Sequence, residues 1–327
     1  MMLGPISSGA AARHTSVAQF ASDVQYYLAL QPRQLPSRYL YDDLGSALFE
    51  AICRLPWYGI TRAELRLLAE HGREIFDRVP RLSRIVELGS GSGEKLTALV
   101  ESAQRRAAPL DLHLIDVSGA ALATAARALG TLGSVRIVTH RATYEAGLEQ
   151  VQTERRPGAT LVLFLGSNIG NFDPPGAAAF LRAIRAALRR GDGLLLGADL
   201  VKPEPELLLA YDDPLGVTAA FNRNLLVRLN GELDGNFDVG GFGHRAEWNA
   251  EHSRVEMHLV SLRRQRVRVR AAALEFEMER GESIWTESSY KYRPDALMTM
   301  LEPVGFRLLE QWLDAESRFA LTLVEAV

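Results

Sequence analysis

From residue 84 onward, short apolar runs alternate with segments whose apolar positions recur at intervals of three and four residues. The short runs predict buried strands, and the three- and four-residue spacing predicts helices that pack on them. The predicted strands are residues 84–89, 110–116, 134–140, 160–166 and 193–200. Strands that alternate with helices form a parallel sheet with helices on both faces, so the pattern predicts an α/β fold.

Two further apolar runs, residues 305–314 and 319–327, end the sequence. Only four residues separate them, so we expect an antiparallel hairpin that completes the sheet. Seven strands with such a pair at the end resemble the Rossmann-like sheet of class I methyltransferases.

The alternation of strands and helices is interrupted between about residue 203 and residue 290. There the stretch RVEMHLVSLRRQRVRVRAAALEFEME alternates with a period of two, which predicts long antiparallel strands. We therefore predict an α+β subdomain inserted between the fifth and sixth strands. The predicted units are a methyltransferase domain (62–202 plus 290–327) and a substrate-binding subdomain (15–61 plus 203–289). A pocket is expected where the two units meet.

The segment VELGSGSGEK places three glycines, Gly89, Gly91 and Gly93, between a predicted strand and a helix. Missing side chains let a ligand approach the backbone there, and Asp116 ends the next strand, where a carboxylate can accept from ribose hydroxyls. Glu87 would repel a pyrophosphate, but it would attract the ammonium and sulfonium groups of S-adenosylmethionine. The pattern favours S-adenosylmethionine over a dinucleotide, with a tight turn that binds no ligand as the alternative.

The segment GSNIGNFDPPG follows the fourth predicted strand. An Asp-Pro-Pro-aromatic signature at a strand end is typical of enzymes that methylate nucleic-acid bases. Here the tripeptide starts at Asp173, eight residues beyond Leu165, and Gly176 follows it instead of an aromatic residue. Alternatively, Asn171 binds the polar end of a small substrate, and the prolines begin a helix.

Composition argues against polyanionic partners. The chain of 327 residues carries 37 basic and 40 acidic side chains, for a net charge of −3, so no nucleic-acid partner is expected. The arginines of residues 263–270 alternate with valines, which is typical of a strand with one solvated face.

Cys53 is the single cysteine, which excludes an internal disulfide and a cysteine-cluster zinc site and predicts a cytoplasmic location. The seven histidines show no metal-ligand spacing, so no metal is expected. No apolar stretch reaches 18 residues, so no membrane association is expected.

Several segments together resemble one family. They are LYDDLGSALFEAICRLPWYGITRAEL (40–65), VELGSGSGEK, LFLGSNIGNF, LLLGADLVK, AYDDPLGVTAAFNRN (210–224) and IWTESSYKYRP (284–294). From about residue 20 to its end, the sequence resembles the histidine Nα-methyltransferases of ergothioneine biosynthesis. The resemblance implies an enzyme that uses S-adenosylmethionine to convert histidine to its trimethylammonium betaine.

The resemblance also implies which residues contact the cofactor. They are Tyr41, Gly89, Lys95 and Asp116, with Thr143 and Tyr144 at the adenine end. The family has an Asp-Phe pair where this chain has Thr143-Tyr144, so a hydroxyl replaces a carboxylate beside the adenine amino group.

For the acceptor, the resemblance implies Asn171 and Tyr211 around the α-amino and carboxylate groups, and Glu287 and Ser289 around the imidazole. Tyr41 and Asn171 would orient the reacting amine, because in-line methyl transfer depends mostly on alignment.

Trp57 stands where the family has a tyrosine that contacts the substrate ring. Tryptophan keeps a flat apolar wall but donates only one hydrogen bond. This difference leaves open a different amino acid or an indole-bearing amine as the acceptor. A further alternative is a binding module that holds S-adenosylmethionine without turnover.

Overall fold

The computed structural model describes residues 17–102, 110–133, 135–154 and 157–327. All seven predicted strands are present in one sheet with the order β12-β13-β6-β5-β2-β3-β4. The strands are β2 (Leu82–Leu88), β3 (Leu110–Asp116), β4 (Val135–Arg141), β5 (Ala159–Phe164), β6 (Gly193–Asp199), β12 (Phe306–Asp314) and β13 (Phe319–Ala326). The five strands from β6 to the edge strand β4 are parallel, and β13 runs antiparallel to both β6 and β12, as predicted. Residue 134, where the third strand was predicted to start, lies outside the described residues.

The predicted fourth strand is two residues too long at its end. It was expected to reach residue 166, but β5 ends at Phe164. Gly166 and Ser167 both have positive φ, 77° and 58°, which an extended strand cannot accommodate. This break turns the chain out of the sheet and into the short helix η2 (Asn168–Asn171).

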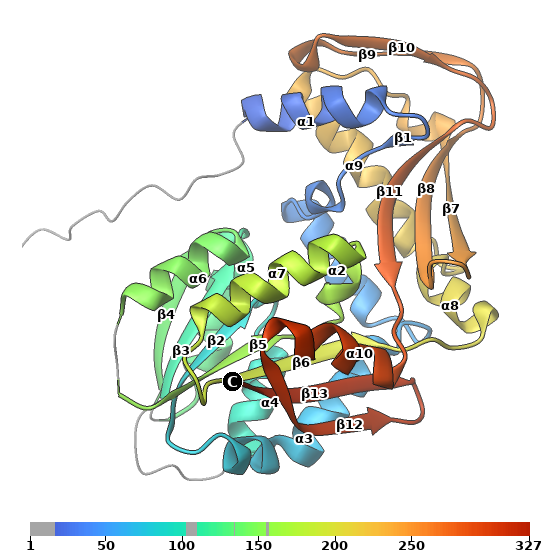
Figure 1. Cartoon of the computed structure of the whole chain (residues 1–327). Helices are drawn as coiled ribbons and strands as arrows, with labels where there is room; N and C mark the ends of the chain where they lie inside the picture. The colour runs from blue at the N-terminus through green and yellow to red at the C-terminus, as the bar shows by residue number, and fades with distance from the viewer. Residues whose placement is uncertain (1–16, 103–109, 134, 155–156) are drawn as a thin grey trace, which may run out of the picture.

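Helices cover both faces of the large sheet (Figure 1). On one face lie α3 (Ile60–Arg78), α4 (Glu94–Ser102) and α5 (Gly119–Leu129), and on the other α6 (Tyr144–Thr153), α7 (Pro174–Ala187) and α10 (Pro294–Leu301). Side chains of β2 alternate between the two layers: Ile85 packs with the first group, and Val86 and Leu88 pack with the second. All three are at most 1% exposed, which explains the continuous apolar run in the sequence.

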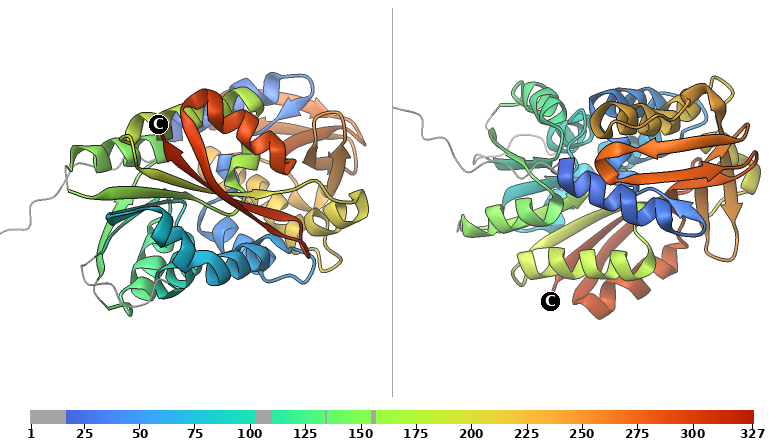
Figure 2. Two further views of the ribbon diagram at one scale, coloured as in Figure 1. Left: turned by 60° about the horizontal axis from the view of Figure 1, so that its bottom comes forward. Right: turned by 90° about the horizontal axis from the view of Figure 1, so that it is seen from above.

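A second, smaller sheet has the order β1-β11-β8-β7. Its strands are β1 (Arg33–Gln34), β7 (Phe242–Asn249), β8 (Arg254–Ser261) and β11 (Ser283–Tyr290), and a separate hairpin consists of β9 (Gln265–Val269) and β10 (Leu274–Met278). The associated helices are α1 (Val17–Ala29), α2 (Asp43–Cys53), α8 (Glu204–Tyr211) and α9 (Val217–Leu233). Figures 1 and 2 show α1 beside the β9–β10 hairpin, although the two are far apart in sequence.

Alternation along β9 places Val267 and Val269 in the core and leaves Arg266 and Arg268 exposed, as the sequence predicted. Arg266 forms an ion pair of 2.6 Å with Glu275 on the neighbouring strand β10.

Two of the predicted unit boundaries fall inside elements. The boundary at residue 61/62 lies within α3, and the boundary at 289/290 lies within β11. A helix or strand is one hydrogen-bonded unit. The first boundary therefore moves to the start of α3 at Ile60, and the second moves to the end of β11 at Tyr290. Residues 15 and 16 of the predicted second unit lie outside the described residues. Among the described helices, none is both long and apolar enough to span a membrane.

Candidate active site

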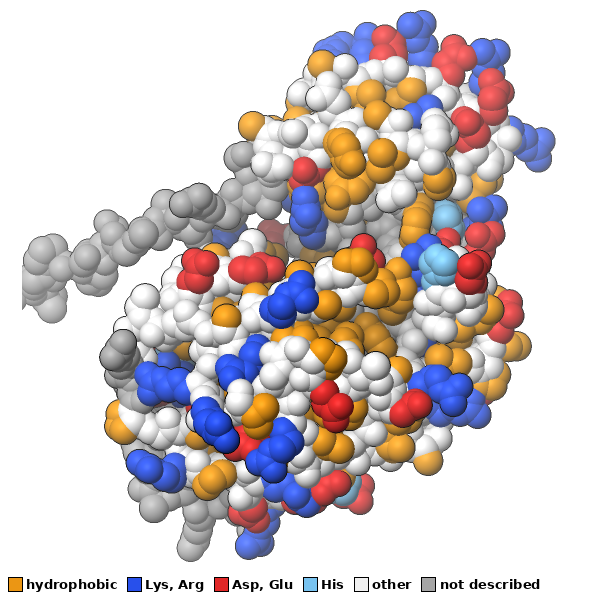
Figure 3. All heavy atoms as spheres, in the orientation of Figure 1, with side chains coloured by type: hydrophobic (Ala, Val, Ile, Leu, Met, Phe, Trp, Pro, Cys, Tyr) orange, Lys and Arg blue, Asp and Glu red, His pale blue; other side chains and the backbone are white. Residues whose placement is uncertain are grey.

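A cavity lies where the two sheets meet, on the side where the parallel strands end. Residues from β8, β11, α2, α8, α9 and η2 line it, together with those that follow β5. Figure 3 shows the molecule hollowed between its upper and lower parts. Five residues singled out in the sequence line the cavity: Tyr41, Asn171, Tyr211, Glu287 and Ser289.

The helix η2 carries Asn171 into the cavity wall. It packs against β11, and a Cβ on Gly170 would lie 2.7 Å from the carbonyl oxygen of Tyr290. Only glycine fits this approach between the two parts of the molecule. The sequence interval from Ser167 to Asn171 is therefore a bridge between the sheets rather than part of a base-binding signature. Asp173 caps α7 by accepting from the backbone N–H of Gly176 at 2.8 Å, and prolines occupy the first turn, as the helix alternative predicted.

Tyr41 is held at the start of α2. The neighbouring Asp42 caps that helix by accepting from the backbone N–H of Gly45 at 2.7 Å, and it also accepts from the side chain of Asn224 on α9 at 2.7 Å. The Tyr41 ring lies 5.5 Å from that of Phe221 and packs edge-to-face on it. Burial, reinforced by the nearby Glu287, raises the pKa of Tyr41 well above its usual value, so its hydroxyl remains a hydrogen-bond donor.

Glu287 and Ser289 project from the same face of β11 into the cavity, as the two-residue alternation predicted. Glu287 is 8% exposed. Burial raises the pKa of this carboxyl to about 7, although the cation of Lys291 opposes the shift. A buried carboxylate in an apolar wall is unfavourable until it receives a hydrogen bond, so Glu287 is suited to accept from a ligand N–H or O–H.

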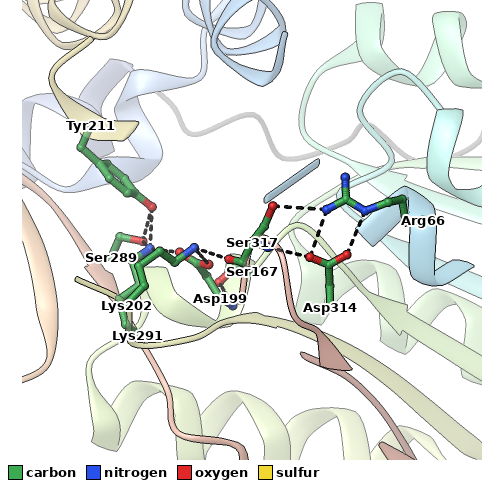
Figure 4. A network of polar contacts seen from close by, with 9 residues as sticks. All are labelled: Arg66, Ser167, Asp199, Lys202, Tyr211, Ser289, Lys291, Asp314 and Ser317. Atoms are coloured by element: carbon green, nitrogen blue, oxygen red, sulfur yellow. Dashed lines mark hydrogen bonds and ion pairs between the residues drawn. The ribbon is translucent and has the colours of Figure 1, made fainter. Parts of the chain in front are cut away.

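Lys291 anchors this wall from behind, as Figure 4 shows. Its ammonium donates to the Tyr211 hydroxyl at 2.7 Å and to the Ser289 hydroxyl at 2.9 Å, and it pairs with Asp199 at 2.9 Å. Asp199 ends β6, so the network ties the large sheet to β11. The sequence analysis missed Lys291 and Asp199. The signal was a lysine between two aromatic residues in YKYRP, which continues the alternation of Glu287 and Ser289.

Tyr58 lines the cavity, whereas the ring contact was predicted for its neighbour Trp57. Tyr58 is 6% exposed and lines the cavity, whereas Trp57 is partly buried against the core and is not among the lining residues. The role of flat wall assigned to Trp57 therefore passes to Tyr58. The side chains of the two neighbours diverge in the turn before α3, and sequence spacing alone did not reveal which one faces the cavity.

The glycine loop lies beside this cavity. Gly89, Gly91 and Gly93 all have positive φ, and a Cβ on Gly93 would lie 2.8 Å from Cα of Ala125 in α5. A Cβ on Gly89 would lie 2.9 Å from the hydroxyl of Tyr144, the first residue of α6. The start of α6 therefore lies beside the loop. These glycines keep the loop compact, and Gly91 leaves open space above it: apart from its own chain neighbours, one atom of the described residues, a carboxylate oxygen of Glu50 at 3.6 Å, lies within 4 Å of its Cβ position.

Asp116 is positioned by the loop and by its own strand end. Its carboxylate accepts from the backbone N–H of Ser118 at 2.8 Å and, at 3.5 Å, from that of Gly91. Burial raises the pKa of this carboxyl, and the backbone N–H groups oppose the shift. Thr143 caps α6 by accepting from the backbone N–H of Ala146 at 3.4 Å, which leaves the proton of its own hydroxyl to donate.

Two buried carboxylates, one near the start of α3 and one near the end of β2, differ in their partners. Glu64, another residue that the sequence analysis missed, accepts from the backbone N–H of Gly166 with both oxygens and pairs with Lys95 at 2.6 Å. One oxygen of Glu87 has no hydrogen-bond partner within the described residues, and burial raises the pKa of this carboxyl to about 8.

The cofactor residues suit S-adenosylmethionine. The hydroxyl of Ser90 is also buried and unpartnered within the part of the chain that the structure describes. A buried carboxyl with a free oxygen, a free hydroxyl and open space above Gly91 together fit a cationic ligand with several hydrogen-bonding groups. Asn168 joins this region to the acceptor cavity, because it lines the cavity and its amide nitrogen lies 3.3 Å from the Cβ position of Gly89.

One other group could coordinate a cation. Among the described residues, Glu247, Glu256 and His258 have ligand atoms within 4.8 Å of one another. They lie on β7 and β8 and do not line the cavity. Arg254 pairs with Oε1 of Glu256 at 2.7 Å, and Oε2 of Glu256 lies 3.3 Å from Nε2 of His258, so the carboxylate already has partners on both oxygens.

Comparisons with known proteins agree with this geometry. Residues 20–326 match the family described as histidine-specific methyltransferases that depend on S-adenosylmethionine. The histidine N-alpha-methyltransferase of Mycobacterium tuberculosis (strain CDC 1551 / Oshkosh) is 41% identical over 92% of this chain and 93% of its own length. The enzyme of the same description from Mycolicibacterium smegmatis is 40% identical over equal shares. An L-tryptophan methyltransferase of Psilocybe serbica is 24% identical over 90% of this chain and 88% of its own length.

Proposed function

The chain belongs to the family of histidine-specific, S-adenosylmethionine-dependent methyltransferases, and from this membership we propose that it methylates the α-amino group of free L-histidine to the trimethylated betaine. The proposal covers the acceptor, the number of methyl groups and the roles of individual residues. The betaine places the enzyme in ergothioneine biosynthesis, and its single cysteine suits a cytoplasmic setting.

The observation that carries the proposal is the pairing of Glu287 with Ser289 on one wall of the cavity. An imidazole N–H donates to the Glu287 carboxylate, and the second ring nitrogen meets the Ser289 hydroxyl. Glu287 is buried, so a ring that leaves it without a hydrogen bond is disfavoured. This explains a preference for histidine over amino acids of similar size with apolar rings.

Asn171 and Tyr211 fix the other end of the amino acid. An asparagine amide accepts through its oxygen and donates through its nitrogen, so Asn171 can bind the amine and the carboxylate of one zwitterion. Tyr211 also lines the cavity, and the family resemblance assigns it to this end of the substrate. Because these contacts involve groups common to all amino acids, they position the acceptor without selecting its side chain.

The cofactor supplies an electrophilic methyl group on a sulfonium. Gly89 and Gly91 let the cofactor approach the backbone closely. Asp116 accepts hydrogen bonds from the ribose hydroxyls of the cofactor, and the carboxyl of Glu87 compensates its positive charge. The remaining contacts come from Tyr41, Lys95, Thr143 and Tyr144.

Alignment of the amine is the main task of the protein in the reaction. The substrate nitrogen must present its lone pair, and Tyr41 and Asn171 orient it toward the cofactor region. A tertiary amine, the substrate of the last transfer, has no N–H left to donate, so binding at this stage rests on the carboxylate and imidazole contacts.

A different amino acid is the second candidate for the acceptor. Phe49, Phe221 and Met257 make much of the cavity lining apolar, and a related enzyme is described as an L-tryptophan methyltransferase. The acidic Glu287 favours histidine because an indole offers only one polar atom to a wall that has two polar groups.

The test is incubation of the purified protein with labelled S-adenosylmethionine and each of the common amino acids, followed by mass spectrometry. We expect histidine to gain up to three methyl groups, all on the α-nitrogen. Preferential methylation of tryptophan or phenylalanine would contradict the proposal. Binding of the cofactor without transfer to any acceptor would support the binding-module alternative instead.

A further inference from the structure

Lys291 is buried behind the acceptor cavity and uses all three of its N–H donors. Its side chain is 0% exposed, and its partners are Asp199, Tyr211 and Ser289 at 2.9, 2.7 and 2.9 Å. An ammonium has no acceptor, so the oxygens of Tyr211 and Ser289 must both accept from it. One lone pair of each hydroxyl is thereby occupied by a fixed donor.

The two hydroxyls also bond to each other, at 2.8 Å. If Tyr211 donates to Ser289, the Ser289 oxygen accepts twice and its own proton must point elsewhere. If Ser289 donates to Tyr211, the same holds for the Tyr211 oxygen. In either arrangement one O–H remains free, and both residues line the cavity. Lys291 occupies two lone pairs that could otherwise accept from a ligand, so it biases this part of the wall toward donation.

Glu287, on the same strand and two residues before Ser289, has the opposite polarity. Its carboxylate accepts, and it lines the same cavity. The cation of Lys291 counteracts the rise of the Glu287 pKa that burial causes, so the lysine also favours the charged, accepting form. The wall therefore combines one donor and one acceptor within a short stretch of β11.

From this network we propose that Lys291 is a positioning residue that occupies a lone pair on both Tyr211 and Ser289, so that the pair presents an O–H donor beside the Glu287 acceptor and the cavity selects a ring carrying both an N–H and an acceptor nitrogen. Neutral imidazole is such a ring. Pyrrole and indole have the N–H but lack the acceptor, and a phenyl ring has neither. The inference rests on the proposed function and adds the reason why the Tyr211–Ser289 pair faces the ring as a donor.

The chain provides a matched control for Lys291. Lys202 pairs with the other oxygen of Asp199 at 2.6 Å and donates to the carbonyl oxygen of Ser317, but it contacts neither cavity hydroxyl (Figure 4). Replacing either lysine by methionine removes one cation from the same carboxylate. Only the Lys291 substitution releases Tyr211 and Ser289.

The experiment compares histidine with its two pyrrolyl analogues, 3-(pyrrol-2-yl)alanine and 3-(pyrrol-3-yl)alanine, which keep a ring N–H at one imidazole nitrogen position and have C–H at the other. We expect wild-type kcat/KM to favour histidine over both by about tenfold or more, as one buried hydrogen bond implies. In Lys291→Met this ratio should fall toward one, while the affinity for S-adenosylhomocysteine, measured by calorimetry, stays within about twofold of wild type. Lys202→Met should keep the wild-type ratio.

Several results would overturn the inference. They are an unchanged ratio in Lys291→Met, an equal loss of the ratio in Lys202→Met, and a wild-type enzyme that methylates histidine no better than the analogues. If the wild type methylates no histidine at all, the proposed function falls, and the inference falls with it. If Lys291→Met does not fold because Asp199 loses a buried partner, the double substitution Asp199→Asn/Lys291→Met removes that charge and carries the same test, with Asp199→Asn as its control.

Discussion

The cofactor region and the acceptor wall lie side by side but are built in different ways. The centre of the proposed cofactor region is local in sequence: Glu87, the glycine loop and Asp116 all belong to one strand–helix–strand unit, and only the contacts proposed for Tyr41, Thr143 and Tyr144 come from outside it. The proposed acceptor wall is assembled from the segment before α2 and from η2, α8 and β11, so Tyr41 and Glu287 meet only through the fold. A local motif tolerates few sequence changes, whereas a wall from many elements can change one side chain at a time and alter the acceptor.

The two regions also differ in how their buried charges are compensated. On the acceptor side Lys291 and Asp199 neutralise each other and hold two hydroxyls. On the cofactor side the Glu64–Lys95 pair is complete, but Glu87 keeps an oxygen without a partner among the described residues. A carboxyl oxygen without a partner suits the cofactor region, because the proposed ligand there carries positive charge. A neutralised ion pair suits the acceptor side, because the proposed ligand there is a zwitterion with a neutral ring.

The largest expected effect concerns Glu64, whose hydrogen bonds and ion pair connect α3 to the segment after β5 and to α4. Glu64→Ala removes the partner of Lys95, whose side chain is 23% exposed, and the carboxylate that accepts from the Gly166 N–H next to the start of η2. Breaking a buried ion pair costs about 3–5 kcal/mol, and Lys95 keeps part of its hydration, so the free energy of unfolding in urea should fall by about 3 kcal/mol. Glu74→Ala, which breaks the exposed pair with Arg78 and a 3.2 Å hydrogen bond from Trp312, should lower it by about 1–2 kcal/mol. Equal losses in the two variants would show that the Glu64 pair has no special structural role.

The next effect separates cofactor binding from acceptor binding. Asp116→Ala should weaken S-adenosylhomocysteine binding by about 2–4 kcal/mol, because two hydrogen bonds to a charged group are lost and water replaces them in part. Isothermal titration calorimetry measures this directly. An unchanged affinity would contradict the placement of the ribose at the end of β3.

A pH-dependent effect should appear on the cofactor side. The folded protein holds the Glu87 proton up to about pH 8, while the unfolded chain releases it near pH 4.5. The folded state therefore binds more protons in this interval, and Glu87 lowers stability progressively as pH rises from about 4.5 to 8. From pH 5 to 7 the loss is about 2–3 kcal/mol at most, since one pKa unit corresponds to about 1.4 kcal/mol.

Glu87→Gln keeps the shape of the side chain and removes the titration. Its unfolding free energy, measured in urea at several pH values, should fall less than that of the wild type over the same range. Parallel pH profiles for the two proteins would mean that Glu87 does not hold a raised pKa in the fold.

The smallest effects test whether Tyr58, rather than Trp57, contacts the substrate ring. Trp57→Phe should change kcat/KM for histidine by less than about twofold, because Trp57 does not line the cavity. Tyr58→Phe removes a lining hydroxyl and should lower it about fivefold, the equivalent of one hydrogen bond of about 1 kcal/mol. A reversed order would return the ring contact to Trp57.

The same contrast explains what the sequence could predict. Hydrophobic periodicity predicted all seven strands of the large sheet and their antiparallel end, and glycine spacing with Asp116 pointed to the cofactor. Alternation predicted that Glu287 and Ser289 share a face. Pattern alone could not reveal Glu64, because its partners Gly166 and Lys95 are distant in sequence and only packing brings them together.

Side-chain direction at turns was equally hidden. Trp57 and Tyr58 are adjacent in a turn that has no fixed period, so nothing in the sequence showed which ring faces inward. Lys291 looked like a residue at the end of a strand, and its role depends on Asp199, which comes from the other sheet. The acceptor wall therefore required the structure, whereas the cofactor loop required little beyond the motif.

The central claim is that Glu287 determines which acceptor ring is preferred, while the cofactor binds independently of Glu287. The most direct measurement is kcat/KM for histidine and phenylalanine in the wild type and in Glu287→Gln, together with S-adenosylhomocysteine affinity in both proteins. We expect histidine to lose about 1.5–3 kcal/mol of transition-state binding, the value of a hydrogen bond to a charged group, while phenylalanine and S-adenosylhomocysteine change little. An equal loss for both acceptors, or a matching loss of S-adenosylhomocysteine affinity, would contradict the account.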